Sequence, residues 1–517
     1  MMPVPRCGRL QLAVLAAVTF VGCLNRIMLA AERPLWFDEA LSVYNSQVTS
    51  YADLLHWKGE DRDQPPLSFI LMKGSGAVLG AWDPWAVRLV TVIAGVLCIP
   101  SVFFLGKVVG SPSLGLWASA LAAFDPVLVS LSATARMYSL LCLGVILTLV
   151  FTVMTIRTVF SLKYCVALGL TLGASLWTSL LGWVPCCTAA LTLALSLTQI
   201  YFSQPTRPSF ARACWGIGTV FVIGGLVGFP SILDTLTQRL SQAGSLHPPS
   251  FSQIMSEIYR GLAHLEPVSH AWILVFVAAC AGVLWLWLRQ GAVVIPLVAL
   301  GLFSFVFAVF LRQRHPFFAA RYLTPLLPVV WIGLATFPAF VGPQKAAVAF
   351  QALLCVLLVF HTLYWVDLMT TWKAHYEFIV SEEVALLRDK IAPGDRVVFS
   401  RQNCLVFGRY YCLPVDMDLE NQLLAHGGVS PAKTKELRSS SNATWLVAAR
   451  VKADEHVDRS QECLESLARA YGVAVNAKEV RKHFRKRHFI VVRVKRDGIE
   501  YSSRDLTGAR SARQDLP

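Results

Sequence analysis

The sequence predicts an all-α membrane protein, a polytopic bundle of about eleven transmembrane helices followed by a small C-terminal α/β domain. Hydrophobic residues make up 55% of the 517 residues and charged residues only 15%, a balance foreign to water-soluble globular proteins. After Trp365 the composition changes, because residues 366–517 carry 25 Lys and Arg against 20 Asp and Glu. We therefore expect a transmembrane domain over 1–370 and a soluble domain over 371–517.

Apolar runs of roughly 20 residues, the length that crosses a bilayer, recur along the first domain. Arg6 and Arg9 flank the first run, and no convincing cleavage site follows it, so we expect it to stay as a membrane anchor with a cytoplasmic N-terminus. The predicted spans are 11–31, 85–106, 113–130, 139–156, 164–181, 183–201, 213–233, 271–288, 292–311, 322–341 and 346–365.

Basic residues in alternate loops give the orientation, because cytoplasmic loops are enriched in Lys and Arg. An odd number of spans then places the C-terminal domain on the extracytoplasmic side. We expect the inner membrane of a bacterial-type cell, or the endoplasmic reticulum in a eukaryote. The basic residues that mark cytoplasmic loops are Lys107, Arg157, Lys163, Arg207, Arg212, Arg289 and Lys345.

The C-terminal domain carries short apolar runs typical of strands at 396–399, 445–448 and 489–494. Helical patterns lie at 382–390 and 461–471. Together they predict a small α/β fold. In this exported region Cys404 and Cys412 either form a disulfide or remain free thiols.

The net charge of +14 does not indicate nucleic-acid binding. Only 21 of the 46 Lys and Arg precede Val366, and these stand singly between apolar runs, which is a topology signal. The 13 cysteines show no metal-binding spacing, and Cys186 and Cys187 are adjacent within an apolar run. We expect no metal ion, no other cofactor and no nucleic-acid partner.

Two acidic segments follow the first span. Pro34-Leu-Trp-Phe-Asp-Glu-Ala40 places Asp38 and Glu39 where the apolar run has just ended, and Asp63 precedes a Pro-Pro pair further on. Taken alone, Asp38 and Glu39 are more typical of an interfacial charge pair that ends a helix than of a catalytic site.

Basic residues also lie on the predicted outer face, where the topology rule disfavours them. Arg136 stands in Ala135-Arg-Met-Tyr138, and the loop before Tyr322 contains Arg312, Arg314 and Arg321. Arg136 can snorkel to lipid headgroups, and the loop can bind anionic lipid. The convergence of acids and arginines on one face favours a site for an anionic substrate.

The order of these motifs resembles a known family. W-F-D-E-A, D-Q-P-P, R-L-V, A-F-D-P, A-R-M-Y and R-Y-L-T-P-L-L-P follow one another as in the GT-C membrane glycosyltransferases, over about the first 370 residues. The sequence is most similar to the dolichyl-phosphate-mannose-protein mannosyltransferase-like branch, which includes the lipid A aminoarabinose transferases. The resemblance implies that Asp38 is catalytic, that Asp63 helps to shape the site and that Arg321 contacts the carrier phosphate. Gln64 stands where the family often has His or Lys.

The chemistry of such a transfer suits the candidate residues. A sugar on a polyprenyl phosphate leaves behind a phosphate whose growing negative charge needs cations, and Arg321, Arg136 and Arg314 can supply them. Tyr138 and Tyr322 adjoin them and complete the donor-phosphate candidates. Asp38, with Glu39 beside it, is the candidate general base for an acceptor hydroxyl.

We therefore expect a hexosyl- or pentosyltransferase that uses a polyprenyl-phosphate or polyprenyl-diphosphate donor. The acceptor is a lipid, a glycan or a protein on the extracytoplasmic face, and membrane lipids surround the protein. No nucleotide-binding glycine loop is present in the sequence. The alternative is a transporter or flippase of lipid-linked sugars, for which charges inside spans and an internal repeat are expected. A membrane scaffold with an exported binding domain explains the tail but not the clustered acids and arginines.

Overall fold

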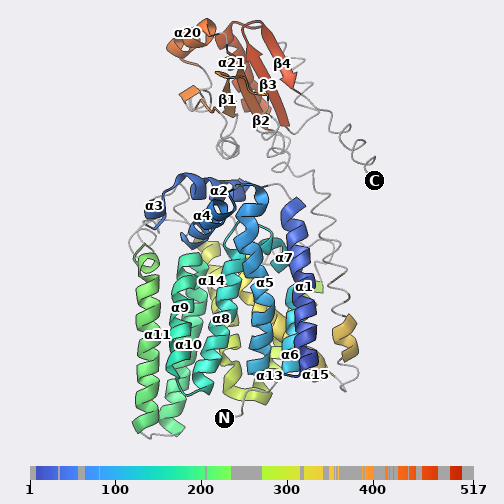
Figure 1. Ribbon diagram of the computed structural model, residues 1–517, viewed down its shortest axis with the longest axis vertical. Helices are drawn as coiled ribbons and strands as arrows, with labels where there is room; N and C mark the ends of the chain where they lie inside the picture. Colours follow the sequence, from blue (N-terminus) through green and yellow to red (C-terminus); the bar gives the residue numbers. More distant parts are fainter. Residues whose placement is uncertain are drawn as a thin grey trace. The chain divides into compact units, whose positions relative to one another are not determined.

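The computed structural model of the chain separates into two compact units (Figure 1). The first unit is Met1–Arg33 with Asn45–Thr370, and the second is Pro34–Tyr44 with Thr371–Pro517. The structure describes residues 7–32, 35, 37–55, 65–80, 82–203, 207–234, 271–314, 320–341, 348–353, 356, 359, 387, 390–399, 414–416, 418–419, 423, 429–440, 442–449, 457–474 and 489–502.

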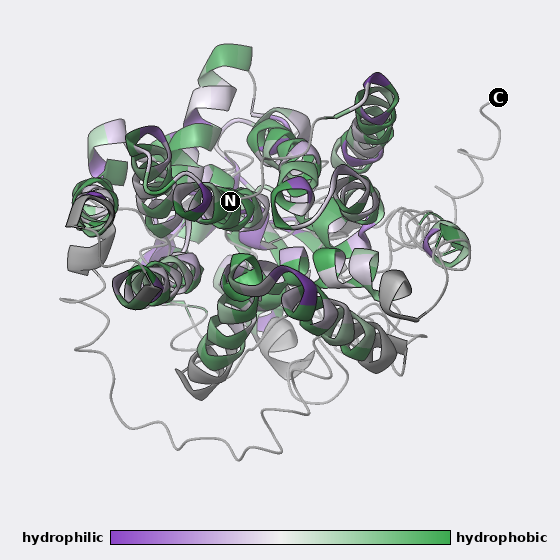
Figure 2. Cartoon of the chain, turned by 90° about the horizontal axis from the view of Figure 1, so that it is seen from below, coloured by the Kyte–Doolittle hydropathy of each residue, from purple (hydrophilic) through white to green (hydrophobic). Residues whose placement is uncertain are grey.

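The first unit is a bundle of apolar helices, seen end-on in Figure 2 with mainly hydrophobic residues along the helices. Its helices are α1 (Arg9–Glu32), α2 (Phe37–Val48, shared with the second unit), α3 (Tyr51–Leu55), α4 (Leu67–Leu79), α5 (Pro84–Val109), α6 (Pro112–Phe124), α7 (Pro126–Ser132), α8 (Tyr138–Arg157), α9 (Leu162–Thr178), η1 (Leu180–Gly182), α10 (Trp183–Ser203), α11 (Arg207–Asp234), α13 (Ala271–Gln290), η3 (Gly291–Val294), α14 (Ile295–Arg314), η4 (Ala320–Leu326) and α15 (Leu327–Val341).

Six helices in the described residues are long and apolar enough to cross a membrane, or seven if the bent pair α6 and α7 is one span. The prediction of a multi-pass helical membrane protein is confirmed. The six are Arg9–Ala31, Pro84–Val109, Tyr138–Arg157, Leu180–Phe202, Phe210–Pro230 and Val277–Phe307.

The total of about eleven spans stays a prediction. The run Val277–Phe307 contains α13 and α14, where the sequence predicts two spans, and Gly291 adopts φ +60° in η3 between them. A residue without Cβ accommodates this left-handed backbone at no steric cost. The helix α9 has 17 residues and α15 has 15, and most of the predicted span 346–365 lies outside the described residues.

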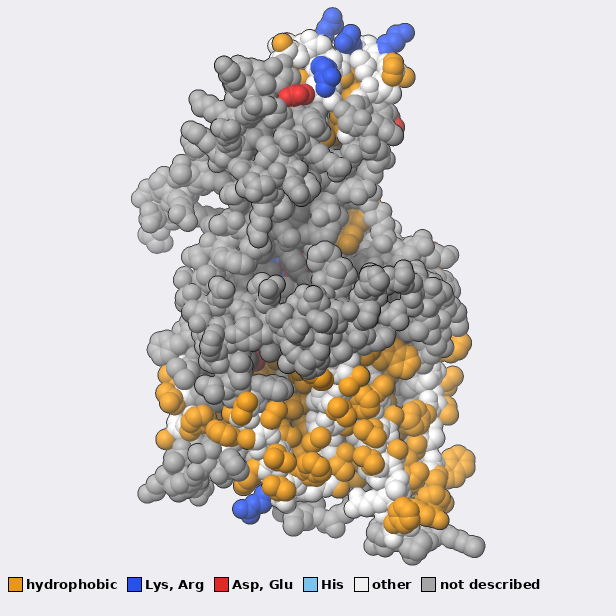
Figure 3. All heavy atoms as spheres, turned by 180° about the vertical axis from the view of Figure 1, so that it is seen from behind, with side chains coloured by type: hydrophobic (Ala, Val, Ile, Leu, Met, Phe, Trp, Pro, Cys, Tyr) orange, Lys and Arg blue, Asp and Glu red, His pale blue; other side chains and the backbone are white. Residues whose placement is uncertain are grey.

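The surface of the helical unit suits hydrocarbon. Large hydrophobic side chains are exposed on it, among them Phe20, Phe104 and Trp215. In Figure 3, hydrophobic side chains cover much of the coloured surface in the lower part of the picture. In water such a surface would be a large exposed apolar patch, whereas in a bilayer it contacts lipid tails.

Small residues let the helices approach closely inside the bundle. A Cβ added at Gly106 of α5 would lie 2.6 Å from the Cα of Gly115 in α6. Likewise, a Cβ at Gly169 of α9 would lie 2.9 Å from Ile223 in α11. In lipid, where water does not drive helices together, this backbone proximity provides the dispersion contacts that hold helices together.

The second unit contains a four-stranded sheet in the order β1-β2-β3-β4. The strands are β1 (Arg396–Phe399), β2 (Thr444–Ala449), β3 (Phe489–Lys495) and β4 (Gly498–Ser502). β1 and β2 are parallel, with Val398 opposite Leu446, and the other two pairs are antiparallel. The first three strands lie where the sequence predicts them.

Two helices accompany this sheet, α20 (Pro431–Ser439) and α21 (Val457–Tyr471). Their apolar faces pack with the sheet into one core that includes Leu437, Leu464 and Val492. α21 contains the predicted helix at 461–471, whereas the predicted helix at 382–390 and the pair Cys404 and Cys412 lie almost entirely outside the described residues.

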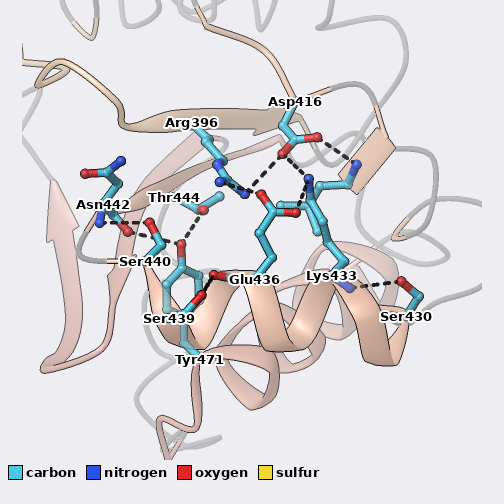
Figure 4. A network of polar contacts seen from close by, with 11 residues as sticks. Arg396, Asp416, Ser430, Lys433, Glu436, Ser439, Ser440, Asn442, Thr444 and Tyr471 are labelled. Carbon is cyan, nitrogen blue, oxygen red and sulfur yellow. Dashed lines mark hydrogen bonds and ion pairs between the residues drawn. The ribbon is translucent and has the colours of Figure 1, made fainter.

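An ionic network joins β1 to α20 (Figure 4). The Arg396 guanidinium lies 2.6 Å from Glu436 and 3.5 Å from Asp416, and the Lys433 ammonium lies 2.9 Å from Asp416 and 3.2 Å from Glu436. Ser430 caps α20, because its hydroxyl accepts from the amide of Lys433. The network therefore fixes α20 against the sheet edge.

These contacts shift two pKa values in opposite directions. The hydrogen bond from Lys433 lowers the pKa of Glu436. That stabilisation is present above the ordinary glutamate pKa of about 4.3 and is lost as the pH falls through the lower folded value. Burial alone would lower the pKa of Lys433, but hydrogen bonds to Asp416 and Glu436 outweigh burial and raise it. Its stabilisation is full below about pH 10.4 and is lost as the pH rises through the higher folded value.

Glu436→Gln should weaken α20 at neutral pH. We expect amide hydrogen-exchange protection in α20 and β1 to fall about two- to fivefold at pH 7, the range of a partly exposed ion pair. The gap from wild type should narrow only as the pH falls below about 4.3, because the Glu436 carboxyl of the unfolded segment then takes up a proton and the folded carboxylate follows at its lower pKa. Lys435→Gln, at an exposed position of the same helix, is the control. Equal protection in Glu436→Gln and wild type at pH 7 would contradict the stabilising role of the network.

Candidate functional site

Several helix ends meet at one end of the helical unit. The guanidinium of Arg88, near the start of α5, is fully buried and donates to the Ala30 carbonyl near the end of α1 at 2.9 Å. Ser139, at the start of α8, donates to the Thr91 carbonyl of α5, also at 2.9 Å. The segment η4 packs against α7, α8, α14 and α15. This end therefore gathers the end of α1 and the starts of α5 and α8, together with α7 and η4.

Arg136 lies at this end, in the turn between α7 and α8, and Tyr138 is the first residue of α8. The side chains of both are buried, with 5% of Arg136 and 2% of Tyr138 exposed. The amide of Arg136 donates to the Thr134 carbonyl at 2.8 Å, which closes the turn. A guanidinium removed from water to this extent is costly unless polar or charged groups compensate it.

The predicted basic loop reaches the same place. Arg321 and Tyr322 belong to η4, and Arg314 is the last residue of α14. Tyr322 is half-buried and packs against the main core of the bundle, whereas the side chains of Arg314 and Arg321 lie outside the described part. The structure therefore places η4, with the backbone of Arg321, against the two helices that the turn with Arg136 connects.

The A-F-D-P motif forms a break in a membrane helix. α6 ends at Phe124, α7 begins at Pro126, and the two are bent by 59°. Asp125 between them is extended, and its carboxylate accepts from the Leu128 amide at 2.9 Å and from the Trp331 indole N–H of α15 at 2.9 Å. Asp125 thus caps α7 and ties the break to α15, so its role here is structural.

Arg26 of α1 is a buried charge that the sequence reasoning missed. It lies inside the first predicted span, and none of its surface is exposed. Its guanidinium donates to the carbonyls of Ala122 and Ala123 at the end of α6, and to the hydroxyl of Ser132. The available signal was a lone arginine within an apolar run, which in a membrane protein points to function.

The two candidate acids of the first motif lie in the first turn of α2. Asp38 is half-buried and Glu39 is fully buried. Negative charge is favourable there, because unpaired amides make the start of a helix positive. The Asp38 carbonyl accepts from the Ser42 hydroxyl at 2.9 Å. Asp63 and Gln64 lie outside the described residues.

Lys73 of α4 holds the other end of α2, a contact that the sequence did not predict. Its ammonium donates to the carbonyls of Ser46 and Gln47 at 3.0 and 3.1 Å. A cation at a helix C-terminus satisfies unpaired carbonyls and complements the helix dipole. Lys73 therefore holds the C-terminal end of α2 within the first unit.

The chemistry of the described groups suits an anion. Arg88 and Arg136 are buried arginines at one end of the bundle, and η4 carries one further basic residue, Arg321. In low dielectric such cations act more strongly on a phosphate than they would in water. Among the described residues, no group of three or more His, Cys, Asp or Glu is placed to hold a metal ion; that none is needed stays a prediction.

Comparison with known proteins matches part of this region to a family. Residues 63–205 match the model of the dolichyl-phosphate-mannose-protein mannosyltransferase family. This stretch includes α4 to α10 and contains Arg88, Asp125 and Arg136. No curated protein sequence matches the chain.

Solved membrane proteins share the fold. ArnT from Cupriavidus metallidurans in the apo state is 13% identical, with 85% of this chain and 92% of that chain covered and a TM-score of 0.57. ArnT bound to undecaprenyl phosphate is 13% identical, with coverages of 85% and 93% and a TM-score of 0.55. The oligosaccharyltransferase AglB from Archaeoglobus fulgidus, in complex with an inhibitory peptide and a dolichol-phosphate, is 12% identical, with coverages of 98% and 75% and a TM-score of 0.50. The predicted resemblance to GT-C proteins of the ArnT and protein mannosyltransferase type is confirmed.

Proposed function

We propose that this protein is a glycosyltransferase that moves a sugar from a polyprenyl-phosphate or polyprenyl-diphosphate donor to a hydroxyl acceptor. The observation that carries the proposal is the buried Arg136 turn, which lies beside η4 at one end of a membrane bundle. The bundle shares its fold with ArnT and AglB, which are known bound to undecaprenyl phosphate and dolichol-phosphate.

The arginines have a defined task in this reaction. When the bond between the sugar and the phosphate breaks, negative charge accumulates on the departing carrier phosphate. We assign Arg321 to this phosphate, assisted by Arg136 and Arg314, with Tyr138 and Tyr322 as neutral hydrogen-bond donors. Groups fixed before the reaction stabilise developing charge most effectively, because they need no reorganisation. The turn between α7 and α8, closed by its own backbone, meets this requirement.

The acceptor hydroxyl must lose a proton as it attacks the sugar. We assign this general-base role to Asp38, with Asp63 shaping the site and Glu39 beside the base. The start of α2 suits this role, because the helix dipole favours negative charge there. The sugar is a hexose or a pentose, and the acceptor is a lipid, a glycan or a protein.

Transfer can be tested with purified protein in proteoliposomes that receive a panel of radiolabelled polyprenyl-phosphate and polyprenyl-diphosphate sugars. We expect one class of donor to lose its label to an acceptor. A donor that crosses the bilayer with its sugar still attached would instead indicate a transporter or flippase. If every donor remains intact and in place while the protein binds polyprenyl phosphate, the transferase proposal is wrong.

We further propose an extracytoplasmic active site, with the N-terminus cytoplasmic and the second unit outside. This rests on the basic residues in alternate loops. A reporter that is active only outside should give signal when fused after Trp372, and a reporter that is active only in the cytoplasm should not. The reverse pattern would overturn the orientation and with it the extracytoplasmic acceptor.

A further inference from the structure

The break between α6 and α7 leaves backbone carbonyls that need partners. In a continuous helix the carbonyl of Ala122 would accept from the amide four residues later, but that residue is Pro126, which has no N–H. The carbonyl of Ala123 loses its partner because Asp125 is extended. Inside a bilayer each unsatisfied carbonyl costs several kcal/mol, since no water replaces the missing donor.

Arg26 supplies the missing donors. Its Nη2 donates to the Ala122 carbonyl at 3.1 Å, and its Nη1 donates to the carbonyls of Ala123 at 3.0 Å and of Gly22 at 2.8 Å. Its Nε donates to the Ser132 hydroxyl at 3.3 Å, and that hydroxyl in turn donates to the Leu128 carbonyl. One guanidinium thus binds α1, the end of α6 and the end of α7, and its planar fork of donors reaches all three at once.

The neighbouring helix leaves room for this arrangement. A Cβ at Gly95 of α5 would overlap the Ser132 side chain and lie 3.1 Å from the Nε of Arg26. A Cβ at Gly22 would lie 3.3 Å from the Nη1 of Arg26. Gly22 and Gly95 therefore line the space that the Arg26 guanidinium and the Ser132 side chain occupy. The absence of a side chain at Gly95 lets α5 pack directly against the α6–α7 junction.

The junction continues into the site. Ser132 is the last residue of α7, and the next residues form the turn that carries Arg136. We infer that Arg26 is a positioning residue, which holds the bent α6–α7 segment and thereby fixes the α7–α8 turn with Arg136. The consequence for the carrier rests on the proposed function, whereas the consequence for the turn does not.

The first arm of the test measures the turn itself. Hydrogen exchange is recorded without ligand for full-length wild type, Arg26→Met, Arg26→Lys and Gly169→Ala. Gly169→Ala is a matched packing defect, because its added methyl would press on Ile223 at the α9–α11 contact, away from the junction.

We expect exchange of amides 133–137 to be faster by about tenfold or more in Arg26→Met, which corresponds to loss of local opening free energy. Arg26→Lys should show an intermediate exchange rate, because its ammonium keeps the charge but cannot reproduce the planar set of guanidinium donors. Gly169→Ala should leave these amides unchanged. Unchanged exchange of these amides in a folded Arg26→Met protein would overturn the proposal. If Arg26→Met does not fold, Arg26→Lys decides by the same criterion.

The second arm measures binding of undecaprenyl phosphate to wild type, Arg26→Met, Arg136→Ala and the double variant. If Arg26 acts through the turn, its variant should weaken binding about tenfold in the wild-type background and have little further effect once Arg136 is gone. If the double variant loses affinity by the product of the two single-variant factors, Arg26 does not act through Arg136. A further outcome is that Arg136→Ala binds undecaprenyl phosphate with wild-type affinity while amides 133–137 still exchange faster in Arg26→Met. In that case the assignment of Arg136 to the carrier phosphate is wrong, and the positioning role of Arg26 stands.

Discussion

Asp38→Asn should lower the rate of sugar transfer about 100-fold to 10,000-fold at saturating donor, the usual contribution of a general base. Asparagine keeps the size and much of the hydrogen bonding of aspartate but cannot accept the proton of the acceptor hydroxyl. Donor binding should survive, because the arginines that hold the phosphate are untouched. The measurement compares purified variants with equal membrane yield and equal donor affinity.

Glu39→Gln is the matched control for this experiment. Neighbouring residues on α2 point about 100° apart, so the two carboxylates cannot face one hydroxyl equally. Glu39 is fully buried, whereas Asp38 is half-buried, so a role in packing fits Glu39 better. We expect Glu39→Gln to lose less transfer activity than Asp38→Asn. If Asp38 were only an interfacial charge, Asp38→Asn would transfer sugar at the wild-type rate, and the mechanism would be refuted.

Arg321→Ala should nearly abolish turnover. Loss of one charge-assisted contact to the departing phosphate costs about 2 to 4 kcal/mol of transition-state stabilisation, or roughly 30-fold to 1,000-fold in rate. Arg321 belongs to η4, which packs beside the turn that carries Arg136. The readout is kcat/KM for the donor in proteoliposomes, with folding checked by thermal unfolding.

Arg289→Ala controls for the loss of a positive charge as such. Arg289 lies in the last turn of α13, where its guanidinium stacks over Trp285 with 5.2 Å to the ring centre, and the topology assigns it to a cytoplasmic loop. This variant should transfer sugar normally. Wild-type kinetics in a well-folded Arg321→Ala protein would remove Arg321 from the phosphate site.

Much of the architecture follows from the sequence, because the length of apolar runs and the periodicity of apolar residues are strong signals of secondary structure. Runs near 85–106 and 139–156 became α5 and α8, and the β-rich run at 489–494 became β3. The polar elements were missed for a physical reason. α20 has little apolar periodicity and is placed by the Ser430 cap and the ionic network, while β4 forms by pairing with β3.

The candidate site was predictable in part. Arginines on the predicted outer face of the membrane, where the topology rule disfavours them, led to Arg136. The structure places this residue at the end of the bundle where η4 packs. The A-F-D-P motif was noticed, but its 59° bend depends on contacts with α1 and α15. Arg26 was missed because a single arginine near the end of an apolar run reads as part of the span. Its partners outside α1 lie 96 to 106 residues away in sequence.

The central claim is that the protein cleaves a sugar from a lipid phosphate and passes it on. Quantitative mass spectrometry of the lipids in a proteoliposome reaction tests this most directly, because it counts donor, free carrier and glycosylated acceptor together. With wild type, we predict that each sugar gained by the acceptor is matched by one freed polyprenyl phosphate or diphosphate. With Asp38→Asn, almost no glycosylated acceptor and almost no freed carrier should form. Glycosylated acceptor formed without an equal loss of lipid-linked donor, or the same yield from Asp38→Asn, would contradict the account.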